Sequence, residues 1–102
     1  MDFYDKQGNV VDVRTWGQWD KAVTDKGVAE TTLPDGKWVS TVLDGIDMGF
    51  GDGPPLIFET MVFRSEEALA QPVEIMRYAT LAEAQAGHAA MVAKWLEEEK
   101  VQ

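Results

Sequence analysis

The segment from Asp44 to Pro55 contains the residue types that could bind a metal ion or a partner molecule. It reads Asp-Gly-Ile-Asp-Met-Gly-Phe-Gly-Asp-Gly-Pro-Pro and joins two predicted strands. It is far longer than the about two to five residues that usually close a β-hairpin. Ordering a glycine-rich loop costs conformational entropy, and long ordered loops in small domains often carry function. This loop is therefore the first place to look for chemistry.

Three aspartates, Asp44, Asp47 and Asp52, are the weak candidates for a divalent metal site. A calcium-binding loop needs oxygen ligands at alternating positions after its first aspartate. Ile46 and Met48 occupy those positions and cannot coordinate a hard cation. A phosphate cradle is disfavoured as well, because the loop contains no Lys or Arg and three acidic groups would repel the ligand. We predict no metal and no cofactor, with an irregular divalent site as the alternative.

A loop that contacts a protein partner fits these residues better. Met48 and Phe50 would offer adaptable apolar contacts on a flexible rim. The predicted partner-binding residues are Asp47, Met48, Phe50, Asp52 and Pro54. The alternative is a solvated loop whose Phe50 folds back on the core.

Glu59 and His88 form a second candidate, a buried polar pair. Glu59 stands between two apolar residues of its own strand face, and His88 lies in the apolar stripe of a predicted helix. If that helix packs on that face, the two side chains could meet and support acid–base chemistry or metal binding. A satisfied hydrogen bond in the core is the more common role of such a pair. Because no nucleophile in a suitable setting accompanies them, we predict no catalytic residues and a non-enzymatic protein.

The surrounding pattern predicts one α+β domain over residues 1–102, with a mainly antiparallel sheet of about four main strands, a short N-terminal hairpin and two helices. Two capping boxes, Thr15 to Gln18 and Thr80 to Glu83, begin the helices. The turn Pro34-Asp35-Gly36 joins the clearest hairpin. The strands are expected at 3–5, 10–13, 28–33, 38–43, 56–63 and 73–78, and the helices at 15–26 and 81–98.

The strand at 56–63 is apolar on both faces. Leu56, Phe58, Thr60 and Val62 share one face, and Ile57, Glu59, Met61 and Phe63 share the other. Two helices could cover both faces, or a second subunit could cover one of them. The sequence thus leaves a homodimer open.

Composition excludes several classes of protein. The chain has 102 residues, 18 acidic against 9 basic, a net charge of −9 and no cysteine. Direct nucleic-acid binding and attachment to an anionic membrane both require clustered basic residues. Disulfides and thiol catalysis require cysteine. No secretory signal or membrane span is visible. A cytoplasmic location is expected, and an acidic mimic of nucleic acid that inhibits a host protein is a further alternative.

The central motif resembles that of a known family. Residues 38–42, Trp-Val-Ser-Thr-Val, and 49–63, Gly-Phe-Gly-Asp-Gly-Pro-Pro-Leu-Ile-Phe-Glu-Thr-Met-Val-Phe, resemble small uncharacterised proteins of actinobacteriophages, mycobacteriophages among them, and of related prophages. Residues 4–8 and the junction at 77–88 are similar to the same family. In that family a histidine often stands where this chain has Met48, which weakens a metal site in the loop.

The resemblance implies an origin and no activity. It points to a phage accessory protein in the cytoplasm of the host cell. Together with the loop, it leads us to expect a non-enzymatic module that binds a host or phage protein. The alternative is a protein that binds a small ligand or a divalent metal, using the 44–55 loop with Glu59 and His88.

Overall fold

The computed structural model describes residues 3–11, 26–46, 53–69 and 71–101. In chain order its elements are β1 (Phe3–Tyr4), β2 (Val10–Val11), β3 (Gly27–Thr32), β4 (Trp38–Leu43), β5 (Phe58–Phe63), β6 (Glu74–Tyr78) and α3 (Leu81–Val101). The α+β class, the four-stranded sheet and the N-terminal hairpin are as predicted. The described residues contain one helix rather than the expected two. Of the helix predicted over 15–26, residues 15–25 lie outside the described residues.

The main sheet is fully antiparallel, with strand order β3-β4-β5-β6. Its register pairs Thr41 with Thr60 and Val42 with Glu59. The β3–β4 turn forms as its residues predict: Gly36 has φ of 97°, and its amide donates to the Leu33 carbonyl over 2.9 Å. The hydrogen bonds that Asp35 accepts from Lys37 lower the pKa of the aspartate to about 2. A short, chemically specified turn thus joins β3 to β4, whereas 14 residues separate β4 from β5 and ten separate β5 from β6.

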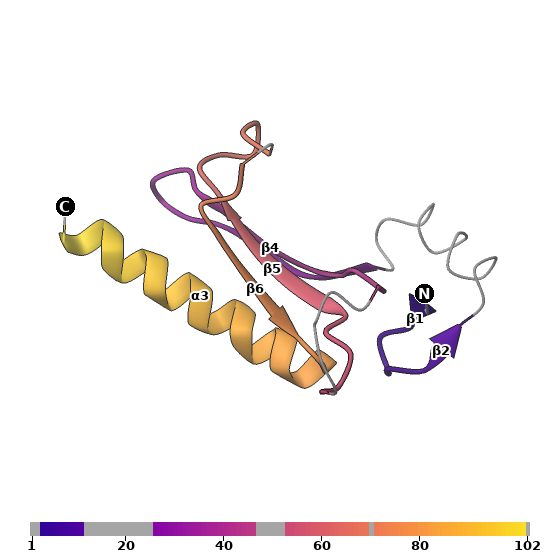
Figure 1. Ribbon diagram of the computed structural model, residues 1–102. Coiled ribbons are helices and arrows are strands. Elements are labelled where there is room, and N and C mark those ends of the chain that lie inside the picture. Colours follow the sequence, from indigo (N-terminus) through magenta and orange to yellow (C-terminus); the bar gives the residue numbers. More distant parts are fainter. Residues whose placement is uncertain (1–2, 12–25, 47–52, 70, 102) are drawn as a thin grey trace.

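Helix α3 begins with the predicted capping box. Thr80 Oγ1 accepts a hydrogen bond from the Glu83 amide at 3.1 Å, and the Thr80 hydroxyl donates to the Glu83 carboxylate at 3.0 Å. The helix then lies across one face of the sheet (Figure 1). Its predicted stripe is the side that packs inward, with Ala84, His88 and Met91 buried. The helix continues past the predicted end at residue 98, to Val101.

The core lies between this helix and the sheet, in two clusters. One joins Leu33, Val39, Val62 and Met91. The other joins Leu43, Ile57, Phe58 and Ala84 near the beginning of the helix. Because β5 begins only at Phe58, Ile57 packs in the same cluster as Phe58 and does not follow the alternation that a strand from residue 56 would impose. The helix therefore covers the Phe58, Thr60 and Val62 face of β5.

The hairpin of β1 and β2 lies beside the end of the sheet where α3 begins (Figure 1). Phe3 forms an isolated antiparallel bridge with Ile46, and the Tyr4 amide donates to the Gly45 carbonyl at 2.8 Å. The hairpin is thereby fixed to the residues that follow β4. None of the described helices is long and apolar enough to cross a membrane.

Candidate functional site

His88 lies inside the domain, between α3 and the sheet. Its Nε2 is 2.9 Å from Thr31 Oγ1 and its Nδ1 is 2.8 Å from Thr41 Oγ1. Thr41 Oγ1 is in turn 2.5 Å from Thr60 Oγ1. Burial lowers the pKa of the imidazole, so the neutral form is favoured. Both ring nitrogens are engaged by threonine hydroxyls, and the arrangement is that of a hydrogen-bonded core histidine.

Glu59 is also buried, but it lies on the other face of the sheet. It precedes Thr60, whose side chain points toward His88, and successive strand residues point to opposite faces. Its partner is Arg77 on β6, with Nε 3.2 Å from Glu59 Oε2. The structure therefore does not bring Glu59 and His88 together, and no acid–base pair forms between them.

A second carboxylate, Asp44, interacts with this ion pair. Burial raises the pKa of Glu59, and the charge of Asp44 raises it further, while Arg77 lowers it. Burial likewise raises the pKa of Asp44, opposed by Arg77 and Lys26. The group is thus two partly desolvated acids balanced by two cations. The group lies where the end of β4 adjoins β5 and β6, and its cations oppose the binding of a metal ion.

Glu59→Gln tests this electrostatic account. A raised folded-state pKa means that the ionised carboxylate costs stability, and that this cost sets in as pH rises above the unfolded value near 4.5. The free energy of unfolding of Glu59→Gln, minus that of the wild type, should therefore increase between pH 4 and pH 7. Chemical denaturation at a series of pH values measures the difference. In an Arg77→Met background, which lacks the favourable partner of Glu59, the same difference in unfolding free energy should increase more steeply with pH. A difference that falls as pH rises would contradict the account.

The candidate metal ligands do not form a site in the part of the chain that the structure describes. No group of three or more His, Cys, Asp or Glu side chains there could hold a metal ion. Asp44 is the only one of the three weak candidates among these residues. Asp47 and Asp52 lie outside them, as do Met48 and Phe50 of the predicted partner-binding set.

The two ends of the 44–55 loop are held together by one carbonyl group. The Ile57 carbonyl accepts hydrogen bonds from the amides of Asp44, at 2.7 Å, and Gly45, at 3.1 Å. Gly45 has φ of 78°, in the left-handed region that favours glycine. These two hydrogen bonds bring the start of the loop next to Ile57, which follows its end, beside the first turn of α3. We refer to this point as the loop neck.

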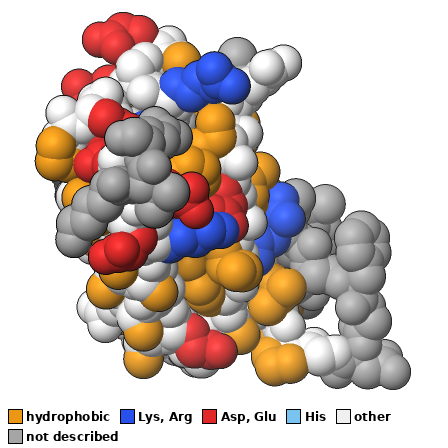
Figure 2. All heavy atoms as spheres, turned by 90° about the vertical axis from the view of Figure 1, so that its left-hand side faces the viewer, with side chains coloured by type: hydrophobic (Ala, Val, Ile, Leu, Met, Phe, Trp, Pro, Cys, Tyr) orange, Lys and Arg blue, Asp and Glu red, His pale blue; other side chains and the backbone are white. Residues whose placement is uncertain are grey.

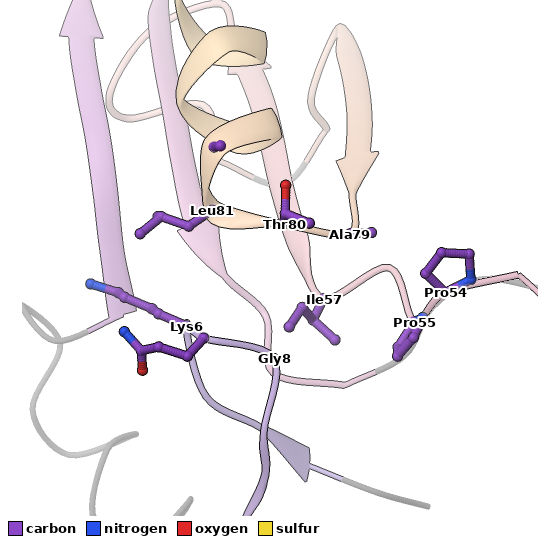
Figure 3. A pocket seen from close by; sticks show the side chains of 10 residues that line it. Lys6, Gly8, Pro54, Pro55, Ile57, Ala79, Thr80 and Leu81 are labelled. Atoms are coloured by element: carbon purple, nitrogen blue, oxygen red, sulfur yellow. The ribbon is translucent and has the colours of Figure 1, made fainter.

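A surface cavity of about 480 Å³ adjoins this neck. Three segments line it: the hairpin turn at 6–8, the end of the loop at Pro54 and Pro55 together with Ile57, and the start of α3 at 79–82. Figure 3 shows Ile57 at its centre, with Lys6 and Gly8 on one side and Leu81 and Thr80 on another. Pro54, the last of the predicted partner-binding residues, lies on its rim together with Pro55. The cavity thus has apolar walls and lies at the end of the predicted partner-binding loop.

Sequence reasoning missed this cavity because its walls are distant along the chain. Lys6 and Leu81 become neighbours only when the hairpin and the helix reach the same end of the sheet. It also missed the Arg77 partner of Glu59, which depends on the β5–β6 register. Arg77 stands between the apolar Met76 and Tyr78 of its strand, and this charged residue within a strand was the available signal.

Comparisons of the chain with protein-family models, with curated proteins and with solved structures give no match. The functional proposal therefore rests on the residues and their geometry.

Proposed function

We propose that this protein is a small, non-enzymatic interaction module whose binding site is the 44–55 loop together with the cavity at its base. The observation that carries the proposal is the cavity, which is lined by three segments and bordered by Pro54 and Pro55. The partner is a host or phage protein. The phage origin and the host-cytoplasm location belong to the same proposal and rest on the resemblance of the sequence.

The chemistry of the cavity suits an apolar anchor. Ile57 and Leu81 form its floor, and the two prolines add rigid apolar walls. Binding energy at protein interfaces is concentrated where an apolar or aromatic side chain fills such a recess and water is excluded around it. In the proposed complex, the partner places one side chain in the cavity, and Met48 and Phe50 contact the surface of the partner around that side chain.

The frame around the cavity is fixed by contacts already described. The loop neck is closed at the Ile57 carbonyl, the hairpin is bound at Gly45, and the helix start is capped by Thr80. A preformed recess costs little ordering on binding.

The distribution of charge agrees with a protein partner. Figure 2 shows one face of the molecule, on which the few basic side chains lie apart, among acidic and hydrophobic ones. The chain carries a net charge of −9. Such a surface repels nucleic acid and assists solubility.

Filling the cavity is the direct test. Ala82 is an exposed cavity residue in the first turn of α3, and Ala82→Trp should occupy the recess without disturbing the core. In affinity capture from an actinobacterial lysate, this variant should recover at least about tenfold less of the partner that the wild type captures, as should Met48→Ala/Phe50→Ala. Ala93→Trp, at an exposed alanine of the same helix away from the cavity, is the matched control and should retain the partner.

Two outcomes would contradict the proposal. One is equal recovery by the wild type, Ala82→Trp and the loop variant. The other is a partner that is still captured by both variants and whose recovery falls steeply as the salt concentration rises. Salt-sensitive binding of that kind would instead support the acidic mimic.

A further inference from the structure

Strand β6 forms one edge of the main sheet, and apolar side chains are exposed along it. Among the described strands, β6 pairs only with β5. Val73, Ile75 and Met76 are 36%, 40% and 49% exposed, and they are three of the five large hydrophobic residues exposed in the described part of the chain. We refer to these three residues as the β6 edge patch.

The charged residues of β6 do not protect this edge. Natural edge strands are usually blunted by outward-facing charges, prolines or bulges. The Glu74 carboxylate instead accepts hydrogen bonds from Lys94 Nζ, at 2.7 and 2.8 Å, and from Trp95 Nε1, at 2.9 Å, both on α3. Arg77 is paired with Glu59 on the other face of the sheet. Glu74 is thus paired with helix α3 and Arg77 with strand β5, and Ile75 and Met76 are left between these two charges.

The opposite edge of the sheet differs. Strand β3 reads Gly-Val-Ala-Glu-Thr-Thr, and its register is interrupted by a bulge between Gly27 and Ala29. Lys6 Nζ also donates to the Gly27 carbonyl at 2.9 Å. A polar sequence, a bulge and a bound lysine protect this edge, so the apolar edge at β6 is the one suited to pairing.

We propose that β6 pairs with β6 of a second copy of this chain. An antiparallel pairing about a two-fold axis perpendicular to the sheet would join the two sheets into one of eight strands. Both helices would then lie on the same face of it. One of these two residues, either Ile75 or Met76, would then lie directly opposite its counterpart in the second copy. The proposal does not rest on the partner-binding cavity, which lies at a different place on the molecule.

Charge favours a second copy as the occupant. A net charge of −9 opposes association of two copies over most of their surface. Strand β6, however, contains one acid and one base and is locally neutral. In a register centred on Ile75, Glu74 faces Met76 of the second copy; in one centred on Met76, Glu74 faces Tyr78 of the second copy. Neither register places like charges opposite each other, so the strand is complementary to itself.

Analytical ultracentrifugation of the full chain at about 150 mM salt, where the Debye length is about 8 Å, tests the proposal. The wild type should form a dimer in the micromolar range. Ile75→Lys should weaken that dimer by more than about tenfold in either register, because the added charge faces either the same substitution or Arg77 of the second copy. Met76→Lys should weaken it to the same extent only in the register centred on Met76, where the added charge faces its own counterpart. Val10→Lys alters an exposed hydrophobic residue of β2, 62% exposed, and should leave the dimer unchanged.

A cross-linking experiment identifies the interface directly. The chain has no cysteine, so Ile75→Cys or Met76→Cys introduces a single thiol. Directly opposite residues of antiparallel strands lie at a Cα separation that a disulfide can span. One of these two variants should form a covalent dimer on mild oxidation, and Val10→Cys should not. A wild type that remains monomeric to several hundred micromolar, or a dimer that persists in both lysine variants, would overturn the proposal.

Discussion

Replacing His88 with alanine should destabilise the protein by about 3 kcal/mol or more. The substitution removes a buried ring, and such large-to-small changes cost about 2–5 kcal/mol in protein cores. It also removes the ring nitrogens that lie 2.9 Å from the half-buried Thr31 hydroxyl and 2.8 Å from the Thr41 hydroxyl, which keeps its contact with Thr60. Each hydrogen bond lost in this way costs about 0.5–1.5 kcal/mol. For a domain of this size the loss corresponds to a fall in Tm of more than about 10 °C.

The pH dependence distinguishes this histidine from a purely apolar core residue. Because burial lowers its pKa, the unfolded chain binds a proton more readily than the folded one. The contribution of His88 is therefore fully present above the unfolded value near 6.5 and is lost as pH falls through the folded-state pKa. The chain has one histidine, so its imidazole resonances follow this titration without overlap.

Two variants serve as controls for the His88 prediction. His88→Leu keeps most of the volume, so it should lose less stability than His88→Ala and should not show the loss below pH 6.5 that depends on the histidine. Thr41→Val keeps the shape of the threonine but leaves Nδ1 without its hydroxyl partner, and should cost about 1–2 kcal/mol. A His88→Ala protein within about 1 kcal/mol of the wild type, by chemical denaturation, would contradict the role assigned to this residue.

The separation of Glu59 and His88 shows where sequence patterns stop being informative. Alternation along β5 correctly divided its residues between two faces, and the helix stripe correctly included His88. Both faces of β5 are largely apolar, however, so hydrophobicity did not indicate which one the helix covers. The helix covers the face on which the hydroxyls of Thr31 and Thr41 can satisfy both ring nitrogens of the histidine.

Local signals predicted the elements well because they act over a few residues. The capping box at Thr80 and the turn at Pro34 to Gly36 depend on contacts within one turn of chain. The cavity depends on three segments that meet only in the folded domain. The predicted partner-binding loop is divided in the same way: Pro54 has a described position at the cavity, while the expected contacts of Met48 and Phe50 remain predictions.

Replacing Gly87 with alanine should destabilise the protein, whereas helix propensity alone predicts that it stabilises the helix. Alanine is more favourable than glycine in a helix interior by about 1 kcal/mol. A Cβ at position 87 would, however, lie 2.2 Å from Cε1 and 2.3 Å from Cζ of Tyr78. The Tyr78 ring packs against the cluster of Leu43, Ile57, Phe58 and Ala84, so moving it disturbs the core. Overpacking typically costs about 1–3 kcal/mol, and Gly87→Ala should be destabilising by about 1–2 kcal/mol net.

The test is a double-mutant cycle between the two positions, measured by chemical denaturation. In a Tyr78→Ala background the steric conflict is absent, so adding Gly87→Ala should stabilise the helix by about 0.5–1 kcal/mol. Ala86→Gly, at the neighbouring exposed position, should cost about 1 kcal/mol and shows that propensity acts normally in this turn. The reversal of sign between the two backgrounds is the decisive result, because only close packing of α3 against Tyr78 produces it. If Gly87→Ala stabilises the wild type as well, the helix does not approach β6 as closely as the structure places it.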